Sequence, residues 1–136
     1  MPKVLLVEDN LIYRMVFHQQ FKEHFPAAVI DVAGSGDEAL QKIHQAPPDL
    51  IFMDVRLPGM GGLELSRKIK RDFQNIRVAI LTGYDSQEYR EVARQVGVDR
   101  FFSKESLQWD ELLEFAKSIL DQGKSSGRSG YRPLRD

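Results

Sequence analysis

Five short apolar runs alternate with five amphipathic segments along this chain, and this alternation constrains the fold more than any other feature. The first, third and fourth runs are almost continuously apolar, which is typical of parallel strands covered on both faces. In the segments between the runs, apolar residues recur at helical spacing. The predicted strands are residues 4–7, 28–32, 50–53, 78–81 and 100–102.

This order of elements predicts an α/β domain of the (βα)₅ type, with a doubly wound, five-stranded parallel sheet between two layers of helices. Signals for helix ends agree with it. The stretch SGDE predicts a capping box with Ser35 as N-cap and Glu38 three residues later, and DSQE predicts the same for Asp85 and Glu88. Gly97 stands where a helix is expected to end.

Composition and charge exclude several classes of protein. The 19 basic and 20 acidic residues give a net charge of -1, which offers no electrostatic case for direct nucleic-acid binding. Cysteine is absent, so disulfides and thiolate metal sites are excluded. No apolar run approaches the roughly 20 residues of a membrane span. Since the N-terminus also lacks the pattern of a signal peptide, we expect a cytoplasmic domain without membrane contacts.

The last residues of the chain differ from the rest. Residues 121–136 are rich in Gly, Ser and Arg and show no apolar period. This composition predicts a flexible tail or linker that follows a domain of residues 1–120. The alternative is a basic contact patch, because the segment carries four basic and two acidic residues, a net charge of +2.

Polar side chains follow four of the predicted strands, at the point where each strand ends. Glu8 and Asp9 follow the first, Asp54 the third, Thr82 the fourth and Lys104 the fifth. The carboxyl ends of parallel strands meet at one edge of the sheet. Three carboxylates there are suited to bind Mg²⁺ or Mn²⁺ through their oxygens. Asp54 is then a candidate nucleophile that forms an aspartyl phosphate, with Thr82 and Lys104 contacting the phosphoryl oxygens.

Each of these residues has a simpler explanation when taken alone. An Asp after a strand commonly caps a helix, and either Asp9 or Asn10 is suited to that task. Thr82 is an ordinary β-branched strand residue, and a Lys such as Lys104 usually lies in solvent. Because the acid pair, Asp54, Thr82 and Lys104 each end a different strand in this order, we favour a functional site. We assign only Asn10 to helix capping.

The stretches VLLVEDN, LIFMDVRLPGMGGLEL, VAILTG and FFSKES together resemble the receiver domain of two-component response regulators. The resemblance covers residues 3 to about 120 and implies a CheY-like, flavodoxin-like three-layer fold. It implies that Asp54 accepts a phosphoryl group from a sensor histidine kinase or a phosphotransfer protein. It further implies that Mg²⁺ is bound by Asp9 and Asp54, by Glu8 through a water and by the backbone carbonyl of Arg56.

The same resemblance implies a switch built on Thr82 and Phe101. On phosphorylation the Thr82 hydroxyl moves inward and Phe101 follows, which rearranges a face formed by residues 86–96, 100–102 and 109–120. This face is expected to engage a downstream partner or output domain, such as a helix-turn-helix transcriptional module, or to form a homodimer on phosphorylation. Phe101 is also suited to be a core aromatic of its strand.

Four positions depart from the usual receiver pattern or tune it. Arg56 and Tyr84 stand beside the predicted phosphoryl site, and bulky side chains there would screen the attacking water and prolong the phosphorylated state. Glu105 replaces the proline that usually follows the lysine. We expect a trans Lys104–Glu105 bond, because a cis bond costs about 3–4 kcal/mol without proline. Gly61 replaces a frequent aspartate, which predicts a more permissive loop.

Two other functions fit parts of this pattern. The first is a turnover enzyme, a phosphatase or phosphotransferase with an Asp nucleophile, but dehalogenase-like phosphatases carry that Asp after the first strand rather than the third. The second is an interaction module that is never phosphorylated, which would not need the acids. We therefore predict a signalling domain that is not an enzyme beyond autocatalysed phosphorylation and dephosphorylation of Asp54.

Overall fold

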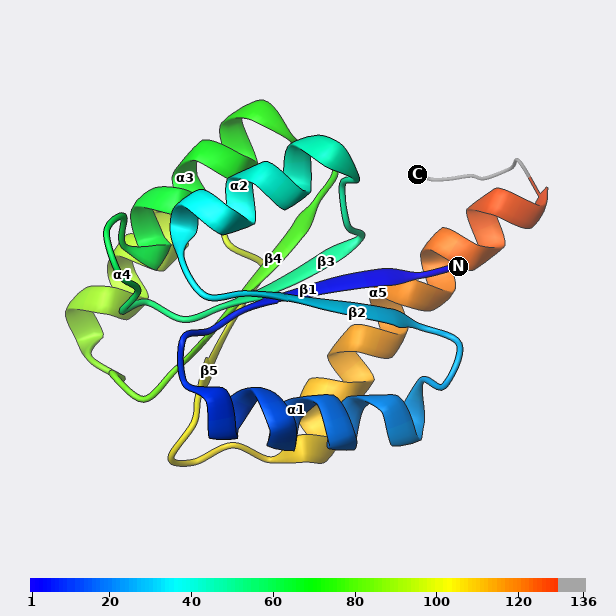
Figure 1. The fold of residues 1–136 in the computed structure, drawn as a ribbon, viewed down its shortest axis with the longest axis horizontal. Coiled ribbons are helices and arrows are strands. Elements are labelled where there is room, and N and C mark those ends of the chain that lie inside the picture. Colours follow the sequence, from blue (N-terminus) through cyan, green and yellow to red (C-terminus); the bar gives the residue numbers. More distant parts are fainter. Residues whose placement is uncertain (130–136) are drawn as a thin grey trace.

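The computed structural model describes residues 1–129 and contains one sheet of five parallel strands, in the order β2-β1-β3-β4-β5 (Figure 1). The strands are β1 (Lys3–Val7), β2 (Val29–Ala33), β3 (Leu50–Met53), β4 (Arg77–Thr82) and β5 (Arg100–Ser103). The helices are α1 (Leu11–His24), α2 (Gly36–Gln45), α3 (Gly62–Asp72), α4 (Gln87–Val96) and α5 (Trp109–Ser129). The predicted (βα)₅ fold is confirmed, and the strand ends agree to within one residue.

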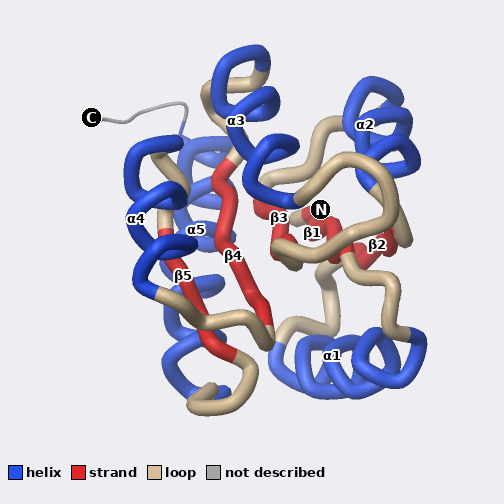
Figure 2. Tube along the Cα trace, turned by 90° about the vertical axis from the view of Figure 1, so that its left-hand side faces the viewer, coloured by secondary structure: helices blue, strands red, loops and turns tan. Residues whose placement is uncertain are grey.

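Helices cover both faces of the sheet: α1 and α5 lie on one face, and α2, α3 and α4 lie on the other (Figures 1 and 2). Successive strand residues point to opposite faces. Leu6 and Phe52 therefore pack with Phe17 of α1, whereas Leu5 packs with Leu65 of α3. All are buried, and each large apolar side chain removed from water stabilises the fold by about 1.5–3 kcal/mol.

Three of the predicted helix ends are confirmed. The side chain of Asn10 accepts a hydrogen bond from the Tyr13 N–H at 2.9 Å and caps α1. Ser35 caps α2 by accepting from the Glu38 N–H at 3.2 Å. Gly97 ends α4 with a φ of 92°, a left-handed conformation that glycine adopts without steric cost.

The predicted cap of α4 is wrong by one residue. Ser86, not Asp85, is the N-cap, and its hydroxyl accepts from the Tyr89 N–H at 3.1 Å. The Asp85 carboxylate instead binds the Arg90 guanidinium through two hydrogen bonds of 2.6 and 3.0 Å. With Ser86 as the cap, the Asp85 carboxylate is free to form this bidentate, charge-assisted pair.

Helix α5 is longer than predicted: it continues to Ser129 rather than ending near residue 120. The predicted division into a domain of residues 1–120 and a flexible tail or linker of residues 121–136 stays a prediction, although α5 extends into the first nine residues of that segment. Once a helix has formed, each added residue gains a hydrogen bond, and residues 121–129 contain no proline to stop it. The rest of the predicted tail, residues 130–136, lies outside the described residues.

Within residues 1–129, none of the helices has both the length and the apolar character needed to cross a membrane.

Candidate functional site

The acids gather where the strand order reverses, between β1 and β3. Val7 pairs with Met53, so Glu8 and Asp54 leave adjacent strands at the same level. The Asp54 N–H donates to the Val7 carbonyl at 3.0 Å, and the Glu8 N–H donates to the Ala33 carbonyl of β2 at 2.9 Å. Rigid sheet backbone therefore fixes both residues at the crevice where ligands of such folds bind.

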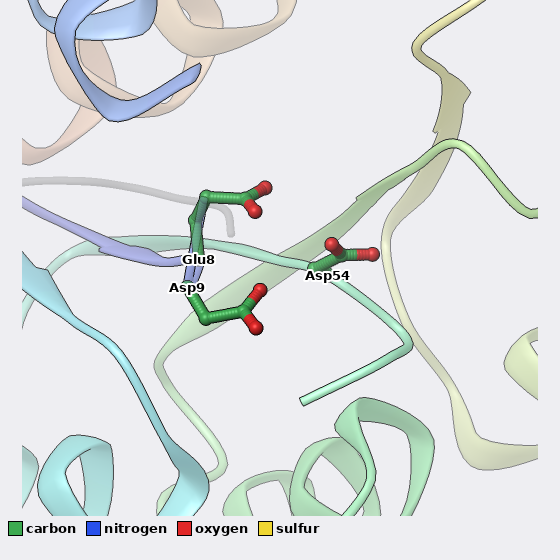
Figure 3. Close-up of side chains that lie close together, drawn as sticks. All are labelled: Glu8, Asp9 and Asp54. Atoms are coloured by element: carbon green, nitrogen blue, oxygen red, sulfur yellow. The ribbon is translucent and has the colours of Figure 1, made fainter. Parts of the chain in front are cut away.

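Glu8, Asp9 and Asp54 form one carboxylate cluster (Figure 3). One oxygen of each lies within 4.8 Å of the others. Glu8 and Asp54 are only 2% and 7% exposed, whereas Asp9 is open to solvent. Oxygen Oδ1 of Asp54 is buried and has no hydrogen-bond partner within the described part of the chain, a costly condition that a cation would relieve. This set of oxygen donors fits a hard divalent cation such as Mg²⁺.

Lys104 reaches the same cluster from the end of β5. Its ammonium lies 2.6 Å from Oε1 of Glu8 and 3.5 Å from Oδ2 of Asp54. Its backbone N–H donates to the Thr82 carbonyl at 2.9 Å, which ties the ends of β4 and β5 together. The sequence predicts that Lys104 contacts a phosphoryl group, and the structure adds a direct ion pair with Glu8.

Both oxygens of Glu8 are already engaged. Oε1 accepts from Lys104, and Oε2 accepts from the Asn10 N–H at 3.0 Å. Burial raises the pKa of Glu8 above its usual value, the hydrogen bonds from Lys104 and Asn10 lower it, and the Asp54 carboxylate raises it again, so that the net direction is upward. The cluster therefore resists carrying its full negative charge, and a bound cation would stabilise the fully ionised form.

Thr82 and Phe101 lie on neighbouring strands, as predicted. Thr82 ends β4, is fully buried, and its hydroxyl accepts from the Tyr84 N–H at 3.1 Å. Phe101 is partly buried against the core beneath α4, and the Arg90 guanidinium lies 4.6 Å above its ring. Phe101 is thus a packed strand aromatic in this structure, and its part in a switch stays a prediction.

Comparison with known proteins decides the family. The family model described as response regulator receiver domain matches residues 4–117. The chain belongs to the response regulator receiver domain family. VraR of Staphylococcus aureus is 33% identical over 135 residues, which is 96% of this chain and 60% of VraR. The chain spans only 49% to 60% of the length of its curated VraR relatives.

Solved structures of receivers agree with the fold. The response regulator TrrA of Thermotoga maritima, in complex with Mg²⁺-BeF, is 30% identical, with a TM-score of 0.77 over 88% of this chain and 100% of TrrA. A DNA-binding response regulator of the LuxR family from Staphylococcus aureus is 28% identical, with a TM-score of 0.79 over 88% of this chain and 98% of that structure. The CheY-like, flavodoxin-like fold is therefore confirmed.

The two side chains predicted to tune hydrolysis in this receiver domain lie against each other. The guanidinium of Arg56 stacks over the Tyr84 ring, 4.1 Å from its centroid. Arg56 is exposed, and Tyr84 is 47% exposed. Each comes from the loop that follows a site residue, Arg56 after Asp54 and Tyr84 after Thr82. A cation–π contact of this kind restrains two otherwise flexible side chains beside the site.

The glycines after Asp54 have tasks that differ from the predicted one. Gly61 has a φ of -70°, which any residue adopts. The loop therefore does not use the wider range of backbone angles that a glycine at position 61 was expected to provide. Gly59, with a φ of 75°, is the turn residue that requires glycine. At Gly62 a Cβ atom would overlap the backbone carbonyl of Asp54, and the Gly62 N–H donates to the Val55 carbonyl at 2.8 Å. Gly62 thus lets α3 begin directly against the site.

Three residues at the site were missed by sequence reasoning. Gly62 lies against the Asp54 backbone, Arg14 donates from Nε to the Glu8 carbonyl at 2.6 Å, and the Tyr13 ring faces Lys104. For Arg14 and Tyr13 a signal was available, because α1 begins shortly after Glu8 and Asp9 and its start must lie beside them. No such signal pointed to Gly62, which begins α3. The Lys104–Glu105 bond is trans as expected, because no peptide bond within residues 1–129 is cis.

Proposed function

We propose that this receiver domain is phosphorylated on Asp54 by a sensor histidine kinase or a phosphotransfer protein. A carboxylate oxygen of Asp54 attacks the phosphorus of a phosphohistidine, the P–O bond forms as the P–N bond breaks, and the departing imidazole nitrogen takes a proton from water. The observation that carries the proposal is the buried, partly unpaired Asp54 carboxylate with the Lys104 ammonium at 3.5 Å. Fixed positive charge beside a transferring phosphoryl group is the main catalytic device in such reactions.

The cofactor that we propose is Mg²⁺, with Mn²⁺ as an alternative. Asp9 and Asp54 would hold it directly, Glu8 through a water, and the backbone carbonyl of Arg56 would complete the set. When bound, the metal would supply positive charge that neutralises phosphoryl oxygens during transfer. The same cluster supports this assignment, because its three carboxylates lie within 4.8 Å of one another and Glu8 is already held by Lys104.

Intact-mass measurement tests the proposal. The wild-type chain and Asp54→Asn are incubated with Mg²⁺ and acetyl phosphate, and each is weighed over time. We expect a single phosphoryl adduct on the wild type and none on Asp54→Asn, because the amide is a poor nucleophile and carries no charge. Thermal unfolding of the variant shows whether it is folded.

The same experiment separates the two rival functions. An interaction module that is never phosphorylated would give no adduct on the wild type. A turnover enzyme would hydrolyse an added phosphoester many times per chain, which release of inorganic phosphate would reveal. One adduct per chain with no steady turnover is the outcome that supports a receiver that is not an enzyme in the usual sense.

The output that we propose acts through α4, β5 and α5, with Thr82 and Phe101 as the switch. A phosphoryl group biases such a switch only if it interacts differently with the two states. The name of the DNA-binding response regulator of the LuxR family supports a DNA-binding output domain, which we propose to be of the helix-turn-helix kind in a cytoplasmic protein. A homodimer formed on phosphorylation gains no support from exposed aromatics, because Trp109 packs against the core cluster, 5.9 Å from the Phe17 ring centre.

The stacked pair of Arg56 and Tyr84 is expected to slow hydrolysis of the aspartyl phosphate. Replacing both by Ala should shorten the lifetime of the phosphorylated state by about tenfold, since about 1.4 kcal/mol of shielding would be lost. The measurement is the decay of the intact-mass adduct after the donor is removed. Gln95→Ala, on the exposed side of α4, is the control. An unchanged decay rate in the double variant would show that these side chains do not screen the water.

An exposed apolar surface on α1, made of Leu11, Ile12, Met15 and Val16, lies beside the acid cluster and is proposed as the docking surface for the phosphodonor. Ile12 and Met15 are 73% and 70% exposed. Met15→Lys should slow transfer from a phosphorylated kinase at least tenfold but leave the rate with acetyl phosphate unchanged. Val92→Lys, a matched change at an exposed apolar residue of α4, should alter neither rate. Equal kinase rates for Met15→Lys and the wild type would exclude this surface.

A further inference from the structure

Tyr13 is an aromatic residue whose ring contacts one of the charged groups of the site. It lies in the first turn of α1, and its ring faces the Lys104 ammonium, with the Nζ atom 4.1 Å from the ring centroid. Lys104 therefore has the Tyr13 ring on one side and the Glu8 carboxylate, at 2.6 Å, on another. The Lys104 side chain is only 18% exposed, so the ring takes a place that water would otherwise fill.

The placement of Tyr13 is fixed independently of Lys104. Its backbone N–H donates to Asn10 Oδ1 at 2.9 Å, and its ring packs against the core cluster between the sheet and α1 and α5. Helix start and core together hold the ring still. Within residues 1–129, the long side chain of Lys104 is held at its end by ion pairs with Glu8 and Asp54, so the ring is the more rigid partner in this contact.

The hydroxyl of Tyr13 takes no visible part in the contact. It is buried and has no hydrogen-bond partner among the described residues. Burial, with the charges of Glu8 and Asp54, raises the pKa of Tyr13, which keeps the hydroxyl neutral. The negative face of the ring, not the hydroxyl, is therefore the part that attracts the ammonium, and cation–π attraction strengthens when the cation is shielded from water.

We propose that Tyr13 is a positioning residue for phosphorylation of Asp54, because its ring face holds the Lys104 ammonium at the acid cluster. The inference rests on the proposed function, in which Lys104 contacts the incoming phosphoryl group. Without the ring, the ammonium gains water and alternative rotamers, and fewer molecules present it at Asp54 when the donor arrives. The rate of phosphorylation then depends on an aromatic ring at position 13 and not on its hydroxyl.

Two substitutions separate the ring from the hydroxyl. Phosphorylation by acetyl phosphate at saturating Mg²⁺ is followed by intact mass for the wild type, Tyr13→Phe and Tyr13→Leu. We expect Tyr13→Phe to stay within twofold of the wild type and Tyr13→Leu to be about tenfold slower. Melting temperatures of all three show whether packing alone has changed.

Two further readouts would not respond to a purely structural role. Fluorinated phenylalanines at position 13 keep the shape of the ring but weaken its negative face, so the rate should fall with each added fluorine. Ring currents should also shift the ε-protons of Lys104 upfield in the NMR spectra of the wild type and Tyr13→Phe, and this shift should vanish in Tyr13→Leu.

The outcomes distinguish this inference from the function on which it rests. A flat rate across the fluorinated series, or a Tyr13→Leu variant as fast as the wild type, overturns the positioning role and leaves Asp54 phosphorylation intact. A wild-type chain that acquires no phosphoryl group overturns both. An unshifted Lys104 resonance in the wild type would also contradict the inference, because the ammonium would then not lie over the ring.

Discussion

Saturating Mg²⁺ is expected to raise the melting temperature of the wild-type chain, and Asp9→Ala is expected to remove most of that gain. A ligand that binds only the folded state stabilises it by about 2.7 kcal/mol at a concentration 100-fold above its Kd. For a domain of this size, that corresponds to a shift of roughly 10 °C. The unfolded chain does not hold the three carboxylates together, so it should not compete for the ion.

Asp9 is the appropriate residue to remove because its neighbours have other partners. Glu8 is tied to Lys104 and the Asn10 N–H, and Asp54 is near Lys104, whereas Asp9 is exposed and makes no such contact among the described residues. Its loss should slightly raise the stability of the metal-free chain, because it relieves repulsion within the cluster. A gain in metal-free stability together with a lost Mg²⁺ response is therefore the expected signature.

Thermal melts at constant ionic strength, with Mg²⁺ or KCl, measure this effect. Glu23→Ala is the matched control, since Glu23 is an exposed acid of α1 at the far end of the helix from the cluster. It should keep the full response to Mg²⁺. A full response in Asp9→Ala would instead place the metal elsewhere on the chain.

Gly62→Ala is expected to destabilise the domain by at least about 2–3 kcal/mol, as forced overpacking against a rigid neighbour does. The added Cβ would overlap the Asp54 carbonyl oxygen and approach the Asp54 carbonyl carbon at 2.8 Å and Val55 Cα at 3.0 Å. All three are backbone atoms, which cannot turn aside as a side chain can. The start of α3 or the loop after Asp54 would have to shift, so phosphorylation should slow as well.

Gly61→Ala supplies the control one residue earlier. Gly61 has an ordinary φ of -70°, and the nearest atom to its Cβ would be the Val55 carbonyl oxygen at 3.7 Å, a normal contact. Urea denaturation gives the free energy of unfolding of both variants and the wild type. If Gly62→Ala proves as stable as Gly61→Ala, the close approach of α3 to Asp54 does not govern stability.

The sequence was sufficient to predict the fold and the main site residues, because both depend on local patterns. Buried parallel strands read as continuous apolar runs, and their order places Glu8, Asp54 and Lys104 at the same edge of any such sheet. Ser35 and Asn10 are N-caps, and an N-cap depends only on residues within the first turn of its own helix. Motif resemblance added the roles of these residues, which spacing alone left open among several explanations.

Other features depend on tertiary contacts that no local pattern reveals. The Glu8–Lys104 pair joins residues from opposite ends of the domain, and the Tyr13–Lys104 contact depends on how α1 enters the sheet. Asp85 and Ser86 are both good caps, and only the structure shows that Ser86 takes the cap while Asp85 pairs with Arg90. The sequence does not distinguish the role of Gly62 from that of Gly61, because only the path of the backbone shows which glycine lies against Asp54.

The central claim is that Asp54 carries the phosphoryl group, and chemical trapping tests it most directly. Borohydride reduces an acyl phosphate to a primary alcohol, so it converts a phosphorylated aspartate into homoserine that peptide mass spectrometry can locate. After treatment with acetyl phosphate and Mg²⁺, we predict homoserine at position 54 alone and none in Asp54→Asn. Reduction at Glu8 or Asp9, or at no carboxylate of a chain that bears the adduct, would contradict the account.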